Sequence, residues 1–294
     1  MPTSKFDYHS PGTVEEASRL LLELGEGAFV LAGGTDLIVK CNHGMIQPKA
    51  VVSLKAIEGL KSITFKRKQG LTIGAGARLA DVEAHPDIRR RYPAVAYAAS
   101  VTANTQIRNM GTVAGNLCNA APSAENAPTL MAMNAEVALL GKNGERRLPL
   151  EDFFKGPGKT ALQPGEILTS IFVPLPPPRS GASYQHISAR GKVDISAVCV
   201  GAMVTLNPGG ACEDVRIVLG AVAPVPMRAV KAEGILKGKK PTQDRIEQAA
   251  EQAMKESKPI SDLRASASYR KAMVRVLTKR ALQEALQRAR KTKG

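Results

Sequence analysis

Two glycine-rich turns, far apart in this 294-residue chain, have the composition that binding chemistry requires. The first is Leu31-Ala32-Gly33-Gly34-Thr35-Asp36-Leu37-Ile38, and the second is Gly111-Thr112-Val113-Ala114-Gly115-Asn116. Glycine at 33 and 34 lets the backbone approach a ligand closely and adopt positive φ. Successive backbone N–H groups then form a nest that binds an anion, helped by the start of a following helix. We therefore predict that each turn can hold a phosphate.

Polar side chains near the second turn extend this interpretation. Thr112 and Asn116 can donate hydrogen bonds to ligand oxygens, and Glu125 can accept one from a ribose hydroxyl. Pro122 stiffens the loop before Glu125. A single glycine pair is often an ordinary turn between a strand and a helix. Two such turns and an acid, however, match a dinucleotide with one diphosphate and two sugar-type ends.

Other motifs that suggest chemistry are incomplete. Gly156-Pro157-Gly158-Lys159-Thr160 resembles the end of a P-loop, but Phe153 stands where that motif needs its first glycine. Leu79 stands where a Rossmann fingerprint beginning at Gly74 needs its third glycine. The four histidines and four cysteines lack metal-ligand spacing, and no G-x-S-x-G elbow occurs. We expect neither a metal site nor a catalytic acid–base set in this chain.

Hydrophobic periodicity predicts the elements that position these groups in the first part of the chain. A capping box at Thr13 and Glu16 begins a helix over 13–24, and Asp36 is predicted to cap a short helix after the first turn. Helical spacing over 80–99 is broken near Pro86 and Pro93. Short apolar runs predict strands at 29–32, 50–54, 71–75, 136–140 and 167–173.

The proline cluster at 174–178 favours a stiff connector, so we predict domains at 1–176 and 177–294. After it, the pattern predicts three antiparallel strands at 183–189, 195–206 and 215–222. Helical spacing predicts a helix around 246–254 and one long helix over 266–290. The apolar residues of the long helix spread over a wide arc, which suggests that it faces both its own domain and a partner.

Composition and charge set limits on function. Apolar and charged contents of 44% and 23% are typical of a globular protein, and no apolar run is long enough to span a membrane. Scattered cysteines and an N-terminus without a secretory signal favour the reducing cytoplasm. Ten Lys or Arg and one acid, Glu284, lie in 264–294, against a net charge of +15 for the whole chain. This segment fits a solvated helix face, a dock for an acidic partner or, with only Tyr269 available for stacking, a nucleic-acid site.

These stretches, together with residues 156–160, 162–168 and 184–194, closely resemble the FAD-binding medium subunit of molybdenum hydroxylases. That family includes the flavoprotein subunits of aerobic carbon monoxide dehydrogenase and bacterial xanthine dehydrogenase. The resemblance covers essentially the whole chain. It implies an α+β fold: a two-lobed FAD-binding domain of the vanillyl-alcohol oxidase (PCMH) type, then a small antiparallel sheet packed on a helical bundle.

The resemblance also implies the residues that bind FAD. The first turn would hold the diphosphate through backbone amides, and the second would form another cradle. Leu168 falls on a strand near the flavin, and Glu125 occupies a position that is usually acidic in the family. His186 stands where many relatives have lysine, and Ala114 replaces a common glycine. The cofactor-binding residues implied are Leu31, Ala32, Gly33, Gly34, Thr35, Asp36, Leu37, Ile38, Thr112, Val113, Ala114, Gly115, Asn116, Glu125, Leu168 and His186.

By the same resemblance, the chain would be an electron-transfer subunit. It would take electrons from a [2Fe–2S] cluster in a small partner, fed by molybdopterin in a large partner, and pass them through FAD to a terminal acceptor. The implied assembly is a cytoplasmic dimer of heterotrimers, a heterohexamer, without nucleic acid. Two alternatives remain at this point: a self-contained flavin reductase or oxidase of the same superfamily, and a nucleic-acid-binding protein that uses the basic C-terminal segment.

Overall fold

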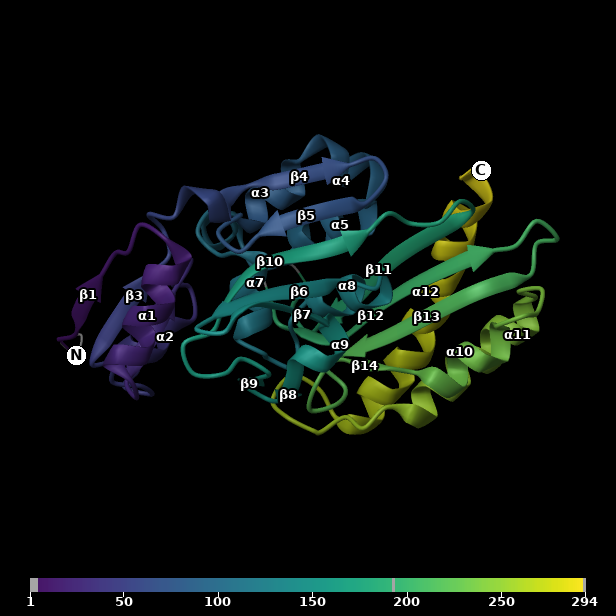
Figure 1. The fold of residues 1–294 in the computed structure, drawn as a ribbon. Helices are drawn as coiled ribbons and strands as arrows, with labels where there is room; N and C mark the ends of the chain where they lie inside the picture. The colour runs from purple at the N-terminus through teal and green to yellow at the C-terminus, as the bar shows by residue number, and fades with distance from the viewer. Residues whose placement is uncertain (1–4, 192–193, 293–294) are drawn as a thin grey trace.

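The computed structural model describes residues 5–191 and 194–292. Its chain runs through two small N-terminal lobes into a broad C-terminal sheet backed by a long helix (Figure 1). The first lobe is a parallel sheet in the order β1-β3-β2, with the helix α1 packed against it. Its elements are β1 Asp7–His9, α1 Val14–Leu24, β2 Ala28–Leu31, α2 Leu37–Asn42 and β3 Ala50–Ser53.

The start of α1 confirms the predicted helix and refines its cap. The hydroxyl of Thr13 accepts a hydrogen bond from the Glu16 N–H at 3.1 Å. The Glu16 carboxylate accepts from the Gly12 N–H at 2.9 Å, and not from Thr13 as a standard capping box would have it. The helix nevertheless begins where the sequence predicts.

The second lobe is an antiparallel sheet in the order β4-β5-β10-β6-β7, surrounded by short helices. Pro86 and Pro93 each occupy the first position of a helix, which explains the predicted breaks. Its strands are β4 Ile63–Lys66, β5 Gly70–Gly74, β6 Glu136–Gly141, β7 Gly144–Pro149 and β10 Ile167–Pro174, with a two-stranded pair of β8 Phe154–Gly156 and β9 Lys159–Thr160. Its helices are the 3-10 turn Glu58–Lys61, α3 Leu79–Ala84, α4 Pro86–Arg91, α5 Pro93–Val101, α6 Thr105–Arg108, α7 Val113–Cys118, α8 Asn126–Ala132 and α9 Leu150–Phe153.

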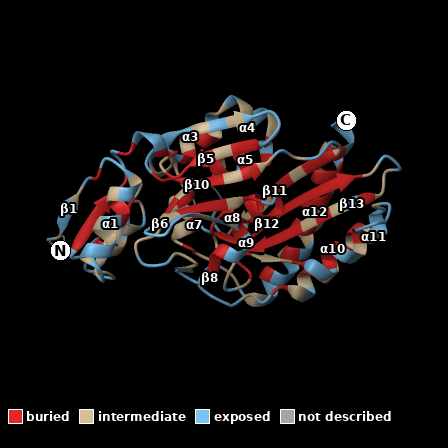
Figure 2. Cartoon of the chain, in the orientation of Figure 1, coloured by how far each residue is buried: buried red, intermediate tan, exposed pale blue. Residues whose placement is uncertain are grey.

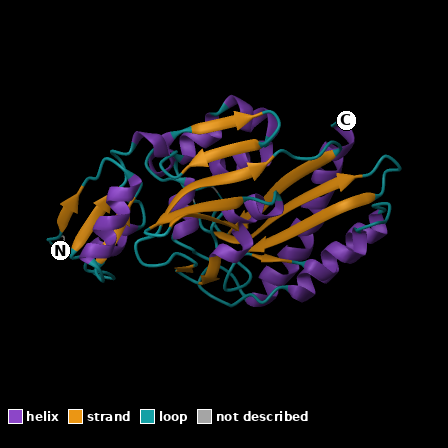
Figure 3. Ribbon diagram, in the orientation of Figure 1, coloured by secondary structure: helices purple, strands orange, loops and turns teal. Residues whose placement is uncertain are grey.

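The C-terminal part is an antiparallel sheet in the order β11-β12-β13-β14 packed on helices, as predicted (Figure 3). Helices α10 and α12 contact the sheet and α11 packs on both of them; β14 and α10 were not predicted. Helix α12 lies across β11 and β12 and also contacts α11. The strands are β11 Ser180–Ser188, β12 Ser196–Leu206, β13 Cys212–Gly220 and β14 Met227–Arg228. The helices are α10 Val230–Leu236, α11 Gln243–Glu256 and α12 Ala267–Lys291.

The opposite face of this sheet is also covered, which the sequence analysis did not predict. Helices α5 and α8 of the second lobe pack against β11, β12 and β13. Every residue of β12 is buried as a result (Figure 2). The contact is close at Gly201, where a Cβ would lie only 2.4 Å from the carbonyl oxygen of Pro128. The second lobe and the C-terminal sheet therefore share an interior, and β12 passes through it.

Much of the charge on the basic C-terminal segment is neutralised within the chain. Arg264, Arg270, Arg275, Lys279 and Arg288 each form an ion pair with a carboxylate. Within the described residues, Lys271, Arg280, Arg290 and Lys291 form no ion pair, so part of the segment belongs to the fold and part keeps its charge unpaired.

Among the described residues, none of the helices combines the length and apolarity that crossing a bilayer requires.

Candidate functional site

The two predicted turns meet in one pocket of about 680 Å³, a volume typical of ligand sites. The turn after β2, the turn before α7, the loop before α8, strand β10 and the β11–β12 connection all contribute to its wall. Most of the predicted site residues line it: Ala32, Gly33, Gly34, Thr35, Asp36, Leu37, Thr112, Ala114, Gly115, Asn116, Glu125 and Leu168. Leu31, Ile38, Val113 and His186 are not part of its wall.

The first turn presents a row of unused backbone donors. Within the described residues, the N–H groups of Gly33, Gly34, Thr35, Asp36 and Leu37 have no hydrogen-bond acceptor. Gly34 has φ +84°, the left-handed conformation that glycine was predicted to supply here. The N–H groups at the start of α2 have no partner within the helix, and those of Gly33, Gly34 and Thr35 extend the row along the pocket. Such a run of free donors favours an anion.

Gly33 has a different role from the one predicted. Its φ is not positive, and a Cβ added to it would lie 2.4 Å from the carbonyl oxygen of Met110 and 2.7 Å from Cα of Gly111. The residue is therefore small because the second turn packs directly on the first. The glycine at 33 fixes the relative position of the two turns.

The second turn supplies hydrogen-bond donors to the pocket mainly from side chains and less from backbone amides. Thr112 is the N-cap of α7, and its hydroxyl oxygen accepts from the Gly115 N–H at 2.9 Å, which leaves the hydroxyl proton free to donate. The side-chain oxygen of Asn116 accepts from Asn126 at 3.2 Å, so its amide NH₂ remains available. The N–H of Ala114 has no acceptor within the described residues. These donors face the same pocket as the first turn.

Asp36 does not cap α2 as the sequence predicted. Its side chain makes no bond to the helix, and instead Oδ1 accepts from the Asn119 side chain at 3.0 Å. Asn119 in turn accepts from Nζ of Lys40 at 2.7 Å. This chain of polar contacts ties the first turn to the end of α7 and holds the Lys40 ammonium at the pocket wall, where it favours a negatively charged ligand.

Glu125 lies at the start of α8 with only 8% of its surface exposed. Burial raises the pKa of its carboxyl group to about 7, although the Ser196 hydroxyl opposes this by donating to Oε1 at 3.3 Å. His186 lies behind Ser196: its Nδ1 is 3.4 Å from the same hydroxyl, and its ring stacks on Tyr184. The direct contact of His186 with a flavin is therefore still only a prediction, and in this structure Ser196 and Glu125 stand between it and the pocket.

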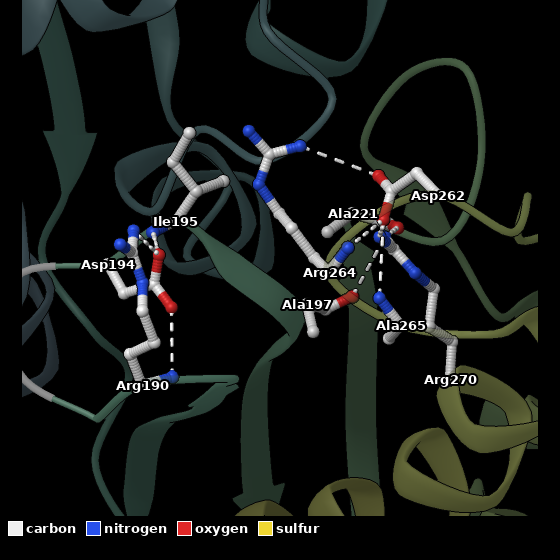
Figure 4. Close-up of polar contacts among 9 residues, drawn as sticks. All are labelled: Arg190, Asp194, Ile195, Ala197, Ala221, Asp262, Arg264, Ala265 and Arg270. Carbon is white, nitrogen blue, oxygen red and sulfur yellow. Dashed lines mark hydrogen bonds and ion pairs between the residues drawn. The ribbon is translucent and has the colours of Figure 1, made fainter.

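The β11–β12 connection closes one side of the pocket with Arg190, Asp194 and Ile195. Asp194 accepts from the Arg190 guanidinium and from the backbone N–H of Arg190 and Ile195, each at 2.9 Å (Figure 4). These bonds lower the pKa of Asp194 to about 2, so the carboxylate stays charged and holds the start of β12 in place.

Arg270 of α12 supports the same strand from the other side (Figure 4). Its buried guanidinium donates to the carbonyl oxygens of Ala197 at 3.1 Å and Ala221 at 2.8 Å, and to Asp262 at 2.7 Å. A cation of the basic segment thus fixes β12 one residue beyond Ser196. Its side chain is buried within the chain.

Sequence reasoning missed several residues of the pocket. Lys40, Asn119, Arg190 and Asp194 line it. Lys40 and Asn119 meet from distant segments, whereas Arg190 and Asp194 pair locally and reach the pocket only because the fold brings the β11–β12 connection there. Ala103 also lines it and has φ +50°, a left-handed conformation that is unusual for a residue other than glycine and often marks a functional site. Leu168 was predicted, and a bulge between Leu168 and Ser170 distorts β10 beside the pocket. No cluster that could hold a metal ion occurs among residues 5–191 and 194–292.

Comparisons with known proteins agree with this geometry. Residues 4–176 match the family described as FAD binding domain in molybdopterin dehydrogenase, and residues 182–285 match the CO dehydrogenase flavoprotein C-terminal domain. The chain is 33% identical to the alpha subunit of the 6-hydroxypseudooxynicotine dehydrogenase complex of Paenarthrobacter nicotinovorans, over 100% of this chain and 98% of that one. It is 31% identical to the putative xanthine dehydrogenase FAD-binding subunit of Escherichia coli K12, over 95% of each.

Among solved structures, the carbon monoxide dehydrogenase of Hydrogenophaga pseudoflava that lacks the Mo-pyranopterin moiety of its cofactor is similar in fold. One of its chains superposes with a TM-score of 0.94 at 33% identity, covering 98% of this chain and 99% of that chain. The α+β architecture and the FAD-binding domain inferred from the sequence are thereby confirmed. The chain therefore belongs to the family of FAD-binding flavoprotein subunits of molybdopterin dehydrogenases.

Proposed function

We propose that this chain carries FAD in the described pocket and transfers electrons within a molybdenum hydroxylase complex. The observation that carries the proposal is the run of backbone N–H groups at 33–37, unused by the protein and lining a pocket that the second turn also reaches. A diphosphate is the part of FAD that needs such donors. Bound FAD supplies the redox chemistry, because it accepts single electrons and passes on pairs.

The other pocket residues fit the remaining parts of this ligand. Thr112 and Asn116 retain free donors, and Lys40 adds a positive charge to the wall. Glu125 can accept a hydrogen bond from a ribityl or ribose hydroxyl when ionised. Leu168 supplies apolar surface from β10. The protein's contribution is to bind and orient the cofactor and to exclude water from it.

We assign the partners from the family. A small subunit with [2Fe–2S] clusters would deliver electrons and a large subunit with molybdopterin would oxidise the organic substrate, in a dimer of heterotrimers located in the cytoplasm. The four free cysteines support a reducing compartment. We place the domain boundary between 176 and 177, in the connector between β10 and β11, which is supported by the separate family matches on either side.

The test is to reduce the flavin in two preparations. The chain is purified alone and loaded with FAD, and it is also co-expressed with the proposed large and small subunits. We expect the organic substrate of the complex to bleach the flavin absorbance only in the complex, because electrons reach FAD through the partner clusters. Bleaching of the isolated chain by an organic donor at the same rate would contradict the proposal and indicate a self-contained reductase or oxidase.

A further inference from the structure

Three polar side chains form a continuous path from the pocket toward the protein surface. Glu125 Oε1 is 3.3 Å from Oγ of Ser196, and that oxygen is 3.4 Å from Nδ1 of His186. Ser196 is 1% exposed, so it exchanges hydrogen bonds with its two neighbours rather than with water. Glu125 immediately precedes α8, Ser196 begins β12 and His186 lies on β11, and the close packing of these elements brings the three residues together.

Both ends of this path are open. The side-chain bond from Ser196 goes to Oε1 of Glu125, and the Glu125 side chain also lines the pocket. Nε2 of His186 makes no hydrogen bond within the described residues and is not fully buried. A proton can therefore enter at one end and leave at the other.

Ser196, in the middle of the path, has a single hydroxyl proton and can donate it to only one neighbour at a time. When Glu125 is ionised, the Ser196 hydroxyl donates to it and must accept from His186, which requires a proton on Nδ1. When Glu125 is protonated, it can donate to Ser196, whose hydroxyl then donates to an unprotonated Nδ1. The two ends are thus linked: the protonation of Glu125 and the tautomer of His186 change together.

Of the groups along this path, Glu125 is the one whose carboxyl pKa lies at about 7. Burial raises the pKa of Tyr184 far above its usual value and that of Cys199 to about 12, so both stay neutral beside Glu125. Burial lowers the pKa of His186, which also contacts the rings of Tyr97 and Tyr184. Arg190 and Asp194 face the pocket but pair with each other.

We propose that Glu125, Ser196 and His186 form a proton relay between the FAD pocket and solvent. In the outward direction the Glu125 carboxyl gives its proton to Oγ of Ser196, while the Ser196 hydroxyl proton passes to Nδ1 of His186. The resulting imidazolium then releases its Nε2 proton to water, leaving Glu125 ionised and His186 neutral with its proton on Nδ1. Inward transfer is the reverse. This inference rests on the proposed function in one respect: the bound FAD is the group that takes up or releases the protons.

The test follows the His186 tautomer by ¹⁵N NMR in the FAD-free chain, with the signal assigned by its loss in His186→Gln. In the wild type we expect the proton to move from Nε2 to Nδ1 as the pH rises through about 7, where Glu125 ionises. Glu125→Gln and Ser196→Ala should each abolish this step. Ser180→Ala is the matched control, because Ser180 is also a buried serine of the sheet, bonded to Thr205 at 2.8 Å, and should leave the step unchanged.

An unchanged tautomer step in Ser196→Ala or Glu125→Gln would overturn the relay. A second measurement uses the FAD-loaded chain: the pH dependence of the flavin midpoint potential should change slope near pH 7 in the wild type and lose this change in Glu125→Gln. Identical slopes in the two proteins would overturn the link to the cofactor. Because the first measurement needs no FAD, a failure of the proposed function to bind FAD is distinguishable from a failure of the relay.

Discussion

Gly33→Ala is the substitution that most sharply probes how the two turns bind their ligand. The added Cβ would lie 2.4 Å from the Met110 carbonyl oxygen, whereas ordinary contacts begin at 3.4 Å, so the turns must separate by about 1 Å. Strain from overpacking of this kind costs about 1–3 kcal/mol. The free chain relieves this strain by moving the turns apart, and binding FAD must bring them together again. The same free energy is then lost from FAD binding, so the Kd for FAD rises by about 5-fold to 150-fold.

The assay is a titration of the FAD-free chain with FAD, followed by quenching of flavin fluorescence. Gly59→Ala is the control, because a Cβ at Gly59 meets nothing within 4 Å. We expect this control to bind FAD like the wild type. A Gly33→Ala variant that binds FAD within about twofold of the wild type would refute the reasoning, since it would mean that the contact between the turns does not set the site.

Three further changes test separate parts of the site. Thr112→Val removes both the cap of α7 and the free hydroxyl proton, so the chain should lose about 1 kcal/mol of stability. In titrations it should also bind FAD more weakly than Thr112→Ser, which keeps the cap and the hydroxyl. Equal FAD affinities of the two variants would argue against a role for the hydroxyl. Burial raises the pKa of Glu125 from 4.5 to about 7, so the folded chain binds more protons than the unfolded chain between these values and loses stability as the pH rises through them. In urea unfolding, the free energy of unfolding of Glu125→Gln minus that of the wild type should therefore rise by about 3 kcal/mol between about pH 5 and about pH 8. A difference that does not change with pH would contradict this. Arg270→Ala breaks three hydrogen bonds of a buried cation and should cost about 3 kcal/mol in the same assay, whereas the exposed Arg280→Ala should cost little; equal losses would show that Arg270 does not support β12.

Local patterns predicted the elements well where local chemistry decides them. The helix breaks at Pro86 and Pro93 follow from the proline ring alone, and the central strands β5, β6, β10, β11, β12 and β13 follow from short apolar runs between turns. The edge strands β4, β7 and β14 were not predicted. The covering of β12 by α8 was not predictable in this way. An unbroken apolar strand is compatible with several partners, and only the folded structure shows that α8 covers it, with Pro128 close to Gly201.

The same distinction holds for the site. The glycine turns and Glu125 stood out because their residue types suit a phosphate and a sugar wherever they lie. Asp36 was assigned to helix capping, since the sequence does not show that Asn119 lies beside it and competes for its oxygen. The position of His186 behind Ser196 likewise depends on the pairing of β11 with β12, which places His186 opposite Cys199, close to the first residue of β12.

The central claim is that main-chain donors of the first turn bind the diphosphate of FAD. The direct measurement is the change in backbone amide ¹H and ¹⁵N shifts when FAD is added to the labelled chain. The account predicts that the amides of Gly33, Gly34, Thr35, Asp36 and Leu37 shift downfield in proton frequency and saturate at one FAD per chain. Tight FAD binding that leaves these five amides unshifted would contradict it.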